Sequence, residues 1–122
     1  FAGFSEHKPW LPVGAGHAER AAAVQEADAG SVLNFTRAAL ALRRGSAALQ
    51  LGEISFPEAP APLLAIRRER AGQTVLCLFN LGSDAATVPA DLLSGFTGNL
   101  ASGTGLSAPA GLPGFGVWIG TS

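Results

Sequence analysis

The sequence predicts a loop and a helix over residues 1–50, followed by a small all-β antiparallel domain, sandwich-like in architecture, over residues 51–122. Three observations support this prediction. A strand–turn–strand pattern occupies Leu63–Gly82, an amphipathic helix pattern occupies Ser31–Arg44, and the composition changes near Leu49–Gly52. A chain of 122 residues is long enough to bury a core.

The first residues of the chain, Phe1–Gly16, show no periodicity. Pro9 and Pro12 flank Trp10 and Leu11, and proline restricts both its own backbone and that of the preceding residue. We therefore expect an ordered loop, anchored by Phe1, Phe4 and Trp10. The alanine-rich stretch that follows, over residues 17–28, predicts a short helical turn.

The helix predicted over Ser31–Arg44 has recognisable ends. Ser31 is expected to cap its N-terminus, because a serine hydroxyl accepts a hydrogen bond from a backbone N–H of the first turn. Arg43 and Arg44 fall in the last turn, and Gly45 is expected to stop the helix in the left-handed conformation. The apolar residues follow helical spacing and form a broad stripe that needs a neighbour: Val32, Leu33, Phe35, Ala39, Leu40 and Leu42.

The hairpin predicted over Leu63–Gly82 has one strand at Leu63–Glu69, a turn at Arg70–Gln73 and a second strand at Thr74–Asn80. Gly72 supplies the positive φ that such a turn requires. Both faces of the second strand are apolar, which is typical of a central strand covered on both sides. An isolated hairpin is only marginally stable, so further strands are needed. Short strands are predicted at Glu53–Pro57, Ala85–Val88 and Phe115–Gly120, whereas Asp91–Gly114 is glycine-rich and weakly patterned.

The composition excludes several classes of partner. The formal charge is −1 and only 14% of residues are charged, so the chain has no basic stripe for nucleic acid. No apolar run approaches the roughly 20 residues of a membrane span, so no membrane partner is expected. Cys77 is the single cysteine and is expected to be a buried, inert thiol, while His7 and His17 are expected at the surface. No cofactor and no metal site are expected, and we expect a cytoplasmic protein. The chain contains no methionine, which indicates a processed product or part of a longer polypeptide.

Three stretches, in this order and spacing, resemble one family. They are Lys8-Pro-Trp-Leu-Pro-Val13 after Ala2-Gly-Phe-Ser5, then Ser31–Arg44 with Ala48-Leu49, then Leu78-Phe-Asn-Leu-Gly82. Together they look like the C-terminal part of α-glucosidases of glycoside hydrolase family 13, in the oligo-1,6-glucosidase and α-glucosyl-transferring branch. The resemblance implies that residues 1–50 are the last loop and last helix of a catalytic (β/α)8 barrel, and that residues 51–122 are the C-terminal β domain.

This family implies a retaining glycosidase, which needs two carboxylates about 5 Å apart and, in this family, a further aspartate. None of the carboxylates of this chain lies in a sequence that matches the catalytic motifs of the family: Glu6, Glu19, Glu26, Asp28, Glu53, Glu58, Glu69, Asp84 and Asp91. The catalytic residues are therefore expected in the polypeptide before Phe1, which would be the partner of this chain. An α-glucoside substrate would bind through that parent enzyme.

Phe4, Lys8 and Trp10 are the candidate residues near a substrate. The resemblance implies that their loop lies close to the mouth of the barrel, where an aromatic face could stack on a sugar. The other interpretation is that they only fix the loop to its surroundings, since Pro-Trp-Leu-Pro is typical of a packing clamp. Trp118, between Val117 and Ile119, is expected in the core of the sheet or at a domain interface.

Two functions follow from the sequence. In the first, the chain is the C-terminal portion of a retaining α-glucosidase or α-glucosyltransferase, structural in this segment and inactive and poorly folded on its own. In the second, it is an independent, non-catalytic carbohydrate-binding or interaction module with a β-sandwich fold. The second function lacks exposed aromatic residues, since the chain has no tyrosine and two tryptophans in apolar surroundings.

Overall fold

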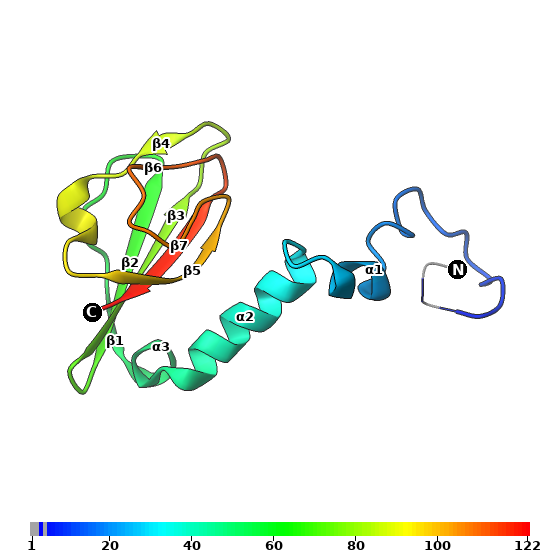
Figure 1. The fold of residues 1–122 in the computed structure, drawn as a ribbon, viewed down its shortest axis with the longest axis horizontal. Coiled ribbons are helices and arrows are strands. Elements are labelled where there is room, and N and C mark those ends of the chain that lie inside the picture. Colours follow the sequence, from blue (N-terminus) through cyan, green and yellow to red (C-terminus); the bar gives the residue numbers. More distant parts are fainter. Residues whose placement is uncertain (1–2, 4) are drawn as a thin grey trace. The chain divides into compact units, whose positions relative to one another are not determined.

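The computed structural model describes residue 3 and residues 5–122 (Figure 1). The chain forms two compact units, one of residues up to Leu40 and one of Ala41–Ser122. Three helices come first: α1 (Ala22–Ala27), α2 (Val32–Gly45) and α3 (Ala47–Leu51). The strands follow: β1 (Glu53–Ser55), β2 (Leu63–Arg70), β3 (Gln73–Asn80), β4 (Ala86–Thr87), β5 (Thr97–Ser102), β6 (Gly111–Leu112) and β7 (Val117–Thr121), with a 3₁₀ turn η1 (Ala90–Leu93) between β4 and β5.

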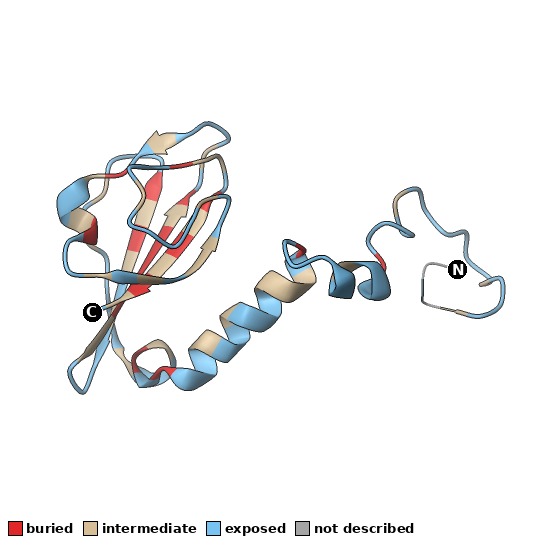
Figure 2. Ribbon diagram, in the orientation of Figure 1, coloured by how far each residue is buried: buried red, intermediate tan, exposed pale blue. Residues whose placement is uncertain are grey.

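All strand pairs of the second unit are antiparallel, which confirms the predicted small antiparallel β domain. Five strands form one sheet in the order β1-β2-β3-β7-β5, and β4 pairs with β6 in a separate two-stranded sheet. The central strand β3 lies between β2 and β7 and carries the longest run of buried residues in the sheet (Figure 2). The prediction that Thr74–Asn80 is a central strand with two apolar faces is therefore confirmed.

The β2–β3 hairpin forms as predicted, with a shorter turn. Arg70 pairs with Gln73, so the turn has only two central residues, Ala71 and Gly72. Their φ angles are 50° and 80°. Positive φ at both central residues is the backbone of a type I′ turn, whose twist matches the twist of the paired strands. The predicted four-residue turn was too long because the strands continue to pair through Arg70 and Gln73.

One face of the large sheet holds the main core. Its members are buried and come from the sheet and from the segments that cover it: Leu63, Ala65, Leu76, Leu78, Val88, Leu93, Leu112 and Trp118. Trp118 is completely buried, and its indole N–H donates to the carbonyl oxygen of Leu106 at 3.1 Å. Of the two positions expected for Trp118, the core of the sheet and a domain interface, the structure shows the core.

The other face of the sheet is partly covered by α3. Ala48 of this short helix packs with Val75 and Cys77, and four half-buried apolar side chains border them: Leu49, Ile66, Phe79 and Ile119. Ser46 caps α3, with its hydroxyl accepting from the backbone N–H of Leu49 and donating to the side-chain oxygen of Gln73 at 2.8 Å. The bond between Ser46 and Gln73 ties α3 to β3.

Helix α2 confirms the predicted helix and its N-cap, but not its end. Ser31 Oγ accepts from the N–H of Asn34 at 3.2 Å, which is the expected cap. Gly45, however, is the last helical residue and has no positive φ, so the predicted left-handed stop is wrong. The helix ends because Ser46 adopts an extended backbone to cap α3.

Strand β5 lies inside Asp91–Gly114, the segment that the sequence left without a strand. Its residues include glycine, asparagine, alanine and serine, which have low β propensity. It forms because β7 offers a free edge, and a bulge at Asn99 shifts the register between Gly98 and Leu100. The strand at the C-terminus begins at Val117, two residues later than predicted, because Phe115 has a positive φ of 57°.

Candidate functional site

The loop before α1 carries the candidate residues near a substrate. Lys8 is exposed, Trp10 has 91% of its surface exposed, and Phe4 lies outside the described residues. Local bonds shape the loop: Ser5 Oγ donates to the carbonyl of His7 at 2.7 Å, and the N–H of Gly14 donates to His17 Nδ1 at 3.2 Å. Trp10 therefore does not anchor the loop against the described part of this chain, in contrast to the expectation. The faces of the Trp10 ring are therefore free to contact another polypeptide or a ligand.

The second stretch that resembles the family, which begins at Ser31, is held at its start by a polar cluster between α1 and α2. The side-chain N–H₂ of Asn34 donates to three backbone carbonyls, those of Gln25, Glu26 and Asp28, at 2.8–3.2 Å. Ser31 Oγ donates to the same carbonyl of Gln25 at 2.7 Å. The cluster fixes the entry of α2 to the end of α1, so Ser31 and Asn34 are structural residues.

Glu26 and Asp28, the closest carboxylates in the sequence, are engaged in this region. Glu26 forms an exposed ion pair with Arg37 at 2.8 Å, and Asp28 Oδ1 accepts from the N–H of Gly30 at 2.9 Å. Glu26 therefore pairs with a side chain of α2 and Asp28 with a local backbone N–H, and both contacts are exposed.

The third stretch is held by Asn80, at the end of β3. Its Nδ2 donates to the carbonyls of Asp84, Leu112 and Pro113 at 2.8–3.1 Å, and its Oδ1 accepts from the N–H of Gly82 at 2.9 Å. Asn80 thus joins the end of β3 to the loop after it and to β6. The sequence marked Asn80 only as the end of a strand, because its partners lie up to 33 residues away.

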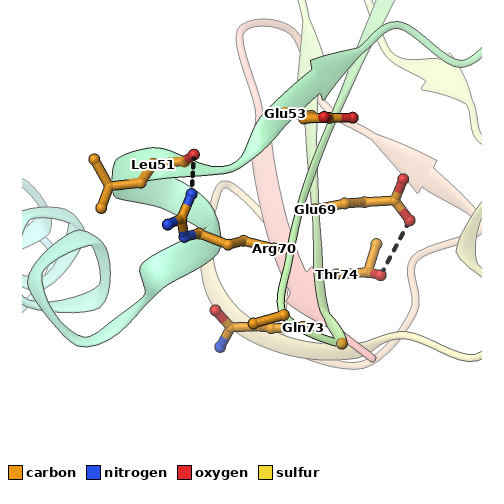
Figure 3. A pocket seen from close by; sticks show the side chains of 8 residues that line it. Leu51, Glu53, Glu69, Arg70, Gln73 and Thr74 are labelled. Carbon is orange, nitrogen blue, oxygen red and sulfur yellow. Dashed lines mark hydrogen bonds between the residues drawn. The ribbon is translucent and has the colours of Figure 1, made fainter.

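One pocket of about 380 Å³ opens at the tip of the hairpin (Figure 3). It is lined by Leu51, Glu53, Glu69, Arg70, Ala71, Gly72, Gln73 and Thr74. Arg70 Nη1 donates to the carbonyl of Leu51 at 3.1 Å, and Glu69 Oε1 accepts from Arg67 at 2.6 Å and from Thr74 at 3.4 Å. Glu53 and Glu69 face each other across β1 and β2, and both are exposed. A glycosidase acid lies instead in a site that excludes water, so this pair lacks the surroundings of a catalytic pair.

Cys77 is buried, as expected, and this burial determines the reactivity of its thiol. Burial raises the pKa of its thiol above the ordinary value of 9.0, and the nearby Arg68 guanidinium lowers it by a smaller amount. A protonated, buried thiol is a poor nucleophile. Among the described residues no group of three or more His, Cys, Asp or Glu side chains could hold a metal ion. No helix in the described part of the chain has the length and apolar character that a membrane span requires.

Comparisons with known proteins agree on one group of enzymes, although no family model matches the chain. A Rhizobium meliloti (strain 1021) protein named "Probable alpha-glucosidase" is 47% identical over 85 residues, which are 70% of this chain and 15% of that protein. The α-glucosyl transfer enzyme XgtA is 38% identical with a TM-score of 0.71, over 94% of this chain and 22% of the other. The trehalulose synthase MutB from Pseudomonas mesoacidophila MX-45 is 26% identical with a TM-score of 0.80, over 98% of this chain and 23% of the other. The chain therefore spans less than a quarter of the length of each of these relatives.

Proposed function

Since the chain corresponds to the C-terminal part of the α-glucosidases of glycoside hydrolase family 13, we propose that it completes a larger retaining α-glucosidase or α-glucosyltransferase. The observation that carries this proposal is the 47% identity over 85 residues to a protein named as an α-glucosidase. Two solved relatives named as a glucosyl transfer enzyme and a trehalulose synthase support it, the second with a structure described as a complex with the substrate sucrose. The substrate class we propose is therefore α-glucosides.

In this proposal residues 1–50 complete the catalytic barrel and residues 51–122 form the C-terminal β domain. Helix α2 supports this division because none of its residues is buried. Val32 is 75% exposed and Leu40 is 47% exposed, although both belong to its apolar stripe. A stripe of this kind is stabilising only when it is covered, and the polypeptide before Phe1 is the partner we propose for it. The cytoplasmic location stays a prediction.

The experiment compares the complete polypeptide with the 122-residue chain, using p-nitrophenyl α-glucoside as substrate. We expect turnover by the complete polypeptide and none by the chain, because the catalytic carboxylates are proposed to lie before Phe1. Turnover by the purified 122-residue chain would reject the proposal. So would a folded complete polypeptide that cleaves neither this substrate nor maltose, isomaltose or sucrose.

For the loop with Phe4, Lys8 and Trp10 we propose a position near the mouth of the barrel, with Trp10 packed against the barrel polypeptide. The exposure of Trp10 in this chain supports a partner outside it. In the complete enzyme, Trp10→Ala is expected to lower the melting temperature and leave KM and kcat of the folded fraction unchanged, with Leu11→Ala as the neighbouring control. A raised KM at unchanged stability would instead assign Trp10 to sugar stacking.

The alternative function, an independent carbohydrate-binding module, has less support. Trp118 is completely buried, so it offers no platform for a sugar ring. Trp10 is exposed, which contradicts the expectation that the chain lacks exposed aromatic residues, and it is the tryptophan on which a sugar could stack. Binding of maltose or isomaltose by the 122-residue chain in a calorimetric titration would favour this alternative.

A further inference from the structure

The two faces of the five-stranded sheet are covered to different extents. On the main-core face, Leu76, Leu78 and Trp118 are almost completely buried. On the opposite face, the part that we call the Arg68 face consists of Ile54, Leu64, Ile66, Arg68, Val75, Cys77, Phe79, Val117 and Ile119. Toward the β5 edge the same side of the sheet continues with Leu100 and with the polar residues Thr97, Ser102 and Thr121. Only Val75 and Cys77 in this set are buried, both against α3.

The rest of the Arg68 face is apolar and only partly covered. Ile54 of the edge strand β1 is 53% exposed, and Leu64, Ile66, Phe79, Val117 and Ile119 are half-buried. These residues are contiguous, since register pairs join Ile54 to Arg68, Leu64 to Phe79, and Phe79 to Val117. A contiguous apolar surface of this kind marks an interaction site more often than isolated exposed residues do.

Arg68 adds a polar feature to this surface. It forms no ion pair or hydrogen bond through its side chain among the described residues, and its Nε is buried without an acceptor. Its register neighbours are the apolar Ile54 and Val75. A buried Nε donor without an acceptor is costly, and an oxygen on a docked surface that binds the guanidinium would offset part of that cost.

We propose that the Arg68 face docks on the polypeptide that precedes Phe1, through an apolar surface that places one carboxylate opposite Arg68. The proposal rests on the proposed function, in which that polypeptide is a barrel. Two observations select this occupant. More than three-quarters of the length of each relative lies outside the matched region. In addition, α2 ends at Gly45 and the chain passes through Ser46 into α3, which lies on the Arg68 face, so the chain enters the β domain at this face.

The test is cysteine labelling of the complete polypeptide and of the 122-residue chain, read by peptide mass spectrometry. Ile54→Cys probes the Arg68 face, and Leu106→Cys is the matched control, because Leu106 is 52% exposed and lies outside that face. We expect the labelling rate of Ile54→Cys to be lower by about tenfold or more in the complete polypeptide than in the chain, because access then requires local opening. Leu106→Cys should react at a similar rate in both.

Val32→Cys separates this inference from the proposed function, because it reports the docking of α2. If Val32→Cys is protected in an active complete enzyme while Ile54→Cys reacts as fast as in the chain, the proposal for the Arg68 face is overturned and the proposed function stands. Protection of Ile54→Cys that already occurs in the 122-residue chain and grows with its concentration also overturns it, in favour of a second copy of the chain.

A second variant tests the carboxylate opposite Arg68. Arg68→Met retains the aliphatic stem and removes the guanidinium. In the 122-residue chain, where Arg68 has no partner among the described residues, the melting temperature should be unchanged or higher. In the complete polypeptide it should fall, because the carboxylate loses its partner; an equal effect in both proteins would overturn the predicted pair.

Discussion

At the scale of single residues, Asn80 connects parts of the chain that the sequence does not place together. It is 2% exposed, and the two N–H groups of its amide serve three carbonyl oxygens, so one of the bonds is shared. Asn80 lies within Leu78–Gly82, one of the three stretches that resemble the family. No local pattern could reveal the role of Asn80, because Leu112 and Pro113 reach it only once β6 has formed.

We predict that Asn80→Asp destabilises the domain by about 2–4 kcal/mol, because a carboxylate cannot donate to the three carbonyls and leaves them unpaired in the interior. Urea unfolding, followed by the fluorescence of the buried Trp118, measures this. Asn99→Asp is the matched control, since Asn99 is exposed, and it should change the free energy of unfolding by less than about 0.5 kcal/mol. Equal effects of the two substitutions would contradict the role assigned to Asn80.

We predict that the stability of the β domain depends on pH because of Cys77. Burial raises the pKa of its thiol in the folded state above the ordinary 9.0, so the folded domain favours the protonated form. This stabilising contribution is complete below pH 9.0 and is lost as the pH rises through the raised pKa, with a slope of at most about 1.4 kcal/mol per pH unit.

The variant Cys77→Ala lacks the thiol and isolates this contribution. The difference in unfolding free energy between the natural chain and Cys77→Ala should decrease when the pH is raised from 7.5 to above 9.0. A difference that is constant over this range would show that the thiol has the same pKa in the folded and unfolded states.

At the scale of elements, the β2–β3 turn makes a prediction about backbone conformation. Gly72 adopts φ of 80° with open space around it, and Ala71 adopts φ of 50°, which costs an L-residue about 1–2 kcal/mol. Gly72→Ala should therefore destabilise the domain by about 1 kcal/mol, whereas Ala71→Asn should stabilise it by about 0.5 kcal/mol, because asparagine tolerates this conformation.

Two controls isolate the effect of φ in this turn. Gly105 also has open space around it but no positive φ, so Gly105→Ala should not destabilise the domain as Gly72→Ala does. Ala85 is exposed and has no positive φ, so Ala85→Asn should bring no gain. If Gly105→Ala costs as much as Gly72→Ala, the turn conformation is not the cause.

The elements that the sequence predicted well are those whose signal is local. The hairpin has β-branched and large apolar residues on both sides of a glycine turn, and α2 has a capping serine followed by a helical stripe. Strand β5 and the end of α2 depend instead on distant or competing partners. β5 is recruited by the edge of β7, and Gly45 stays helical because Ser46 caps the next helix.

At the scale of the whole molecule, the sequence indicated the family of the chain but could not show what the candidate residues Lys8 and Trp10 contact. Lys8 and Trp10 are exposed, and nothing in the described part of the chain packs on the ring of Trp10 or gives it a chemical role. The partners that decide between packing and sugar stacking are proposed to lie before Phe1. The site can therefore be tested only in the complete polypeptide.

The two compact units also predict different resistance to protease. Among the described residues up to Leu40, only Ala21 and Ser31 are buried, whereas both apolar core clusters belong to residues 41–122. In the 122-residue chain, trypsin should therefore cleave after Arg20 and Arg37 well before it cleaves after Arg67 and Arg68, which are paired on both sides within the sheet. Peptide mapping over a time course measures the order of cleavage.

The same digestion tests whether α2 is covered in the complete polypeptide. There, cleavage after Arg37 should slow by at least about tenfold, because a docked helix must open before the protease can bind it. Arg20, in the segment before α1, provides an internal reference within the same unit. If Arg37 is cleaved equally fast in the two proteins, then α2 is not docked, and the apolar stripe that begins at Val32 has another purpose.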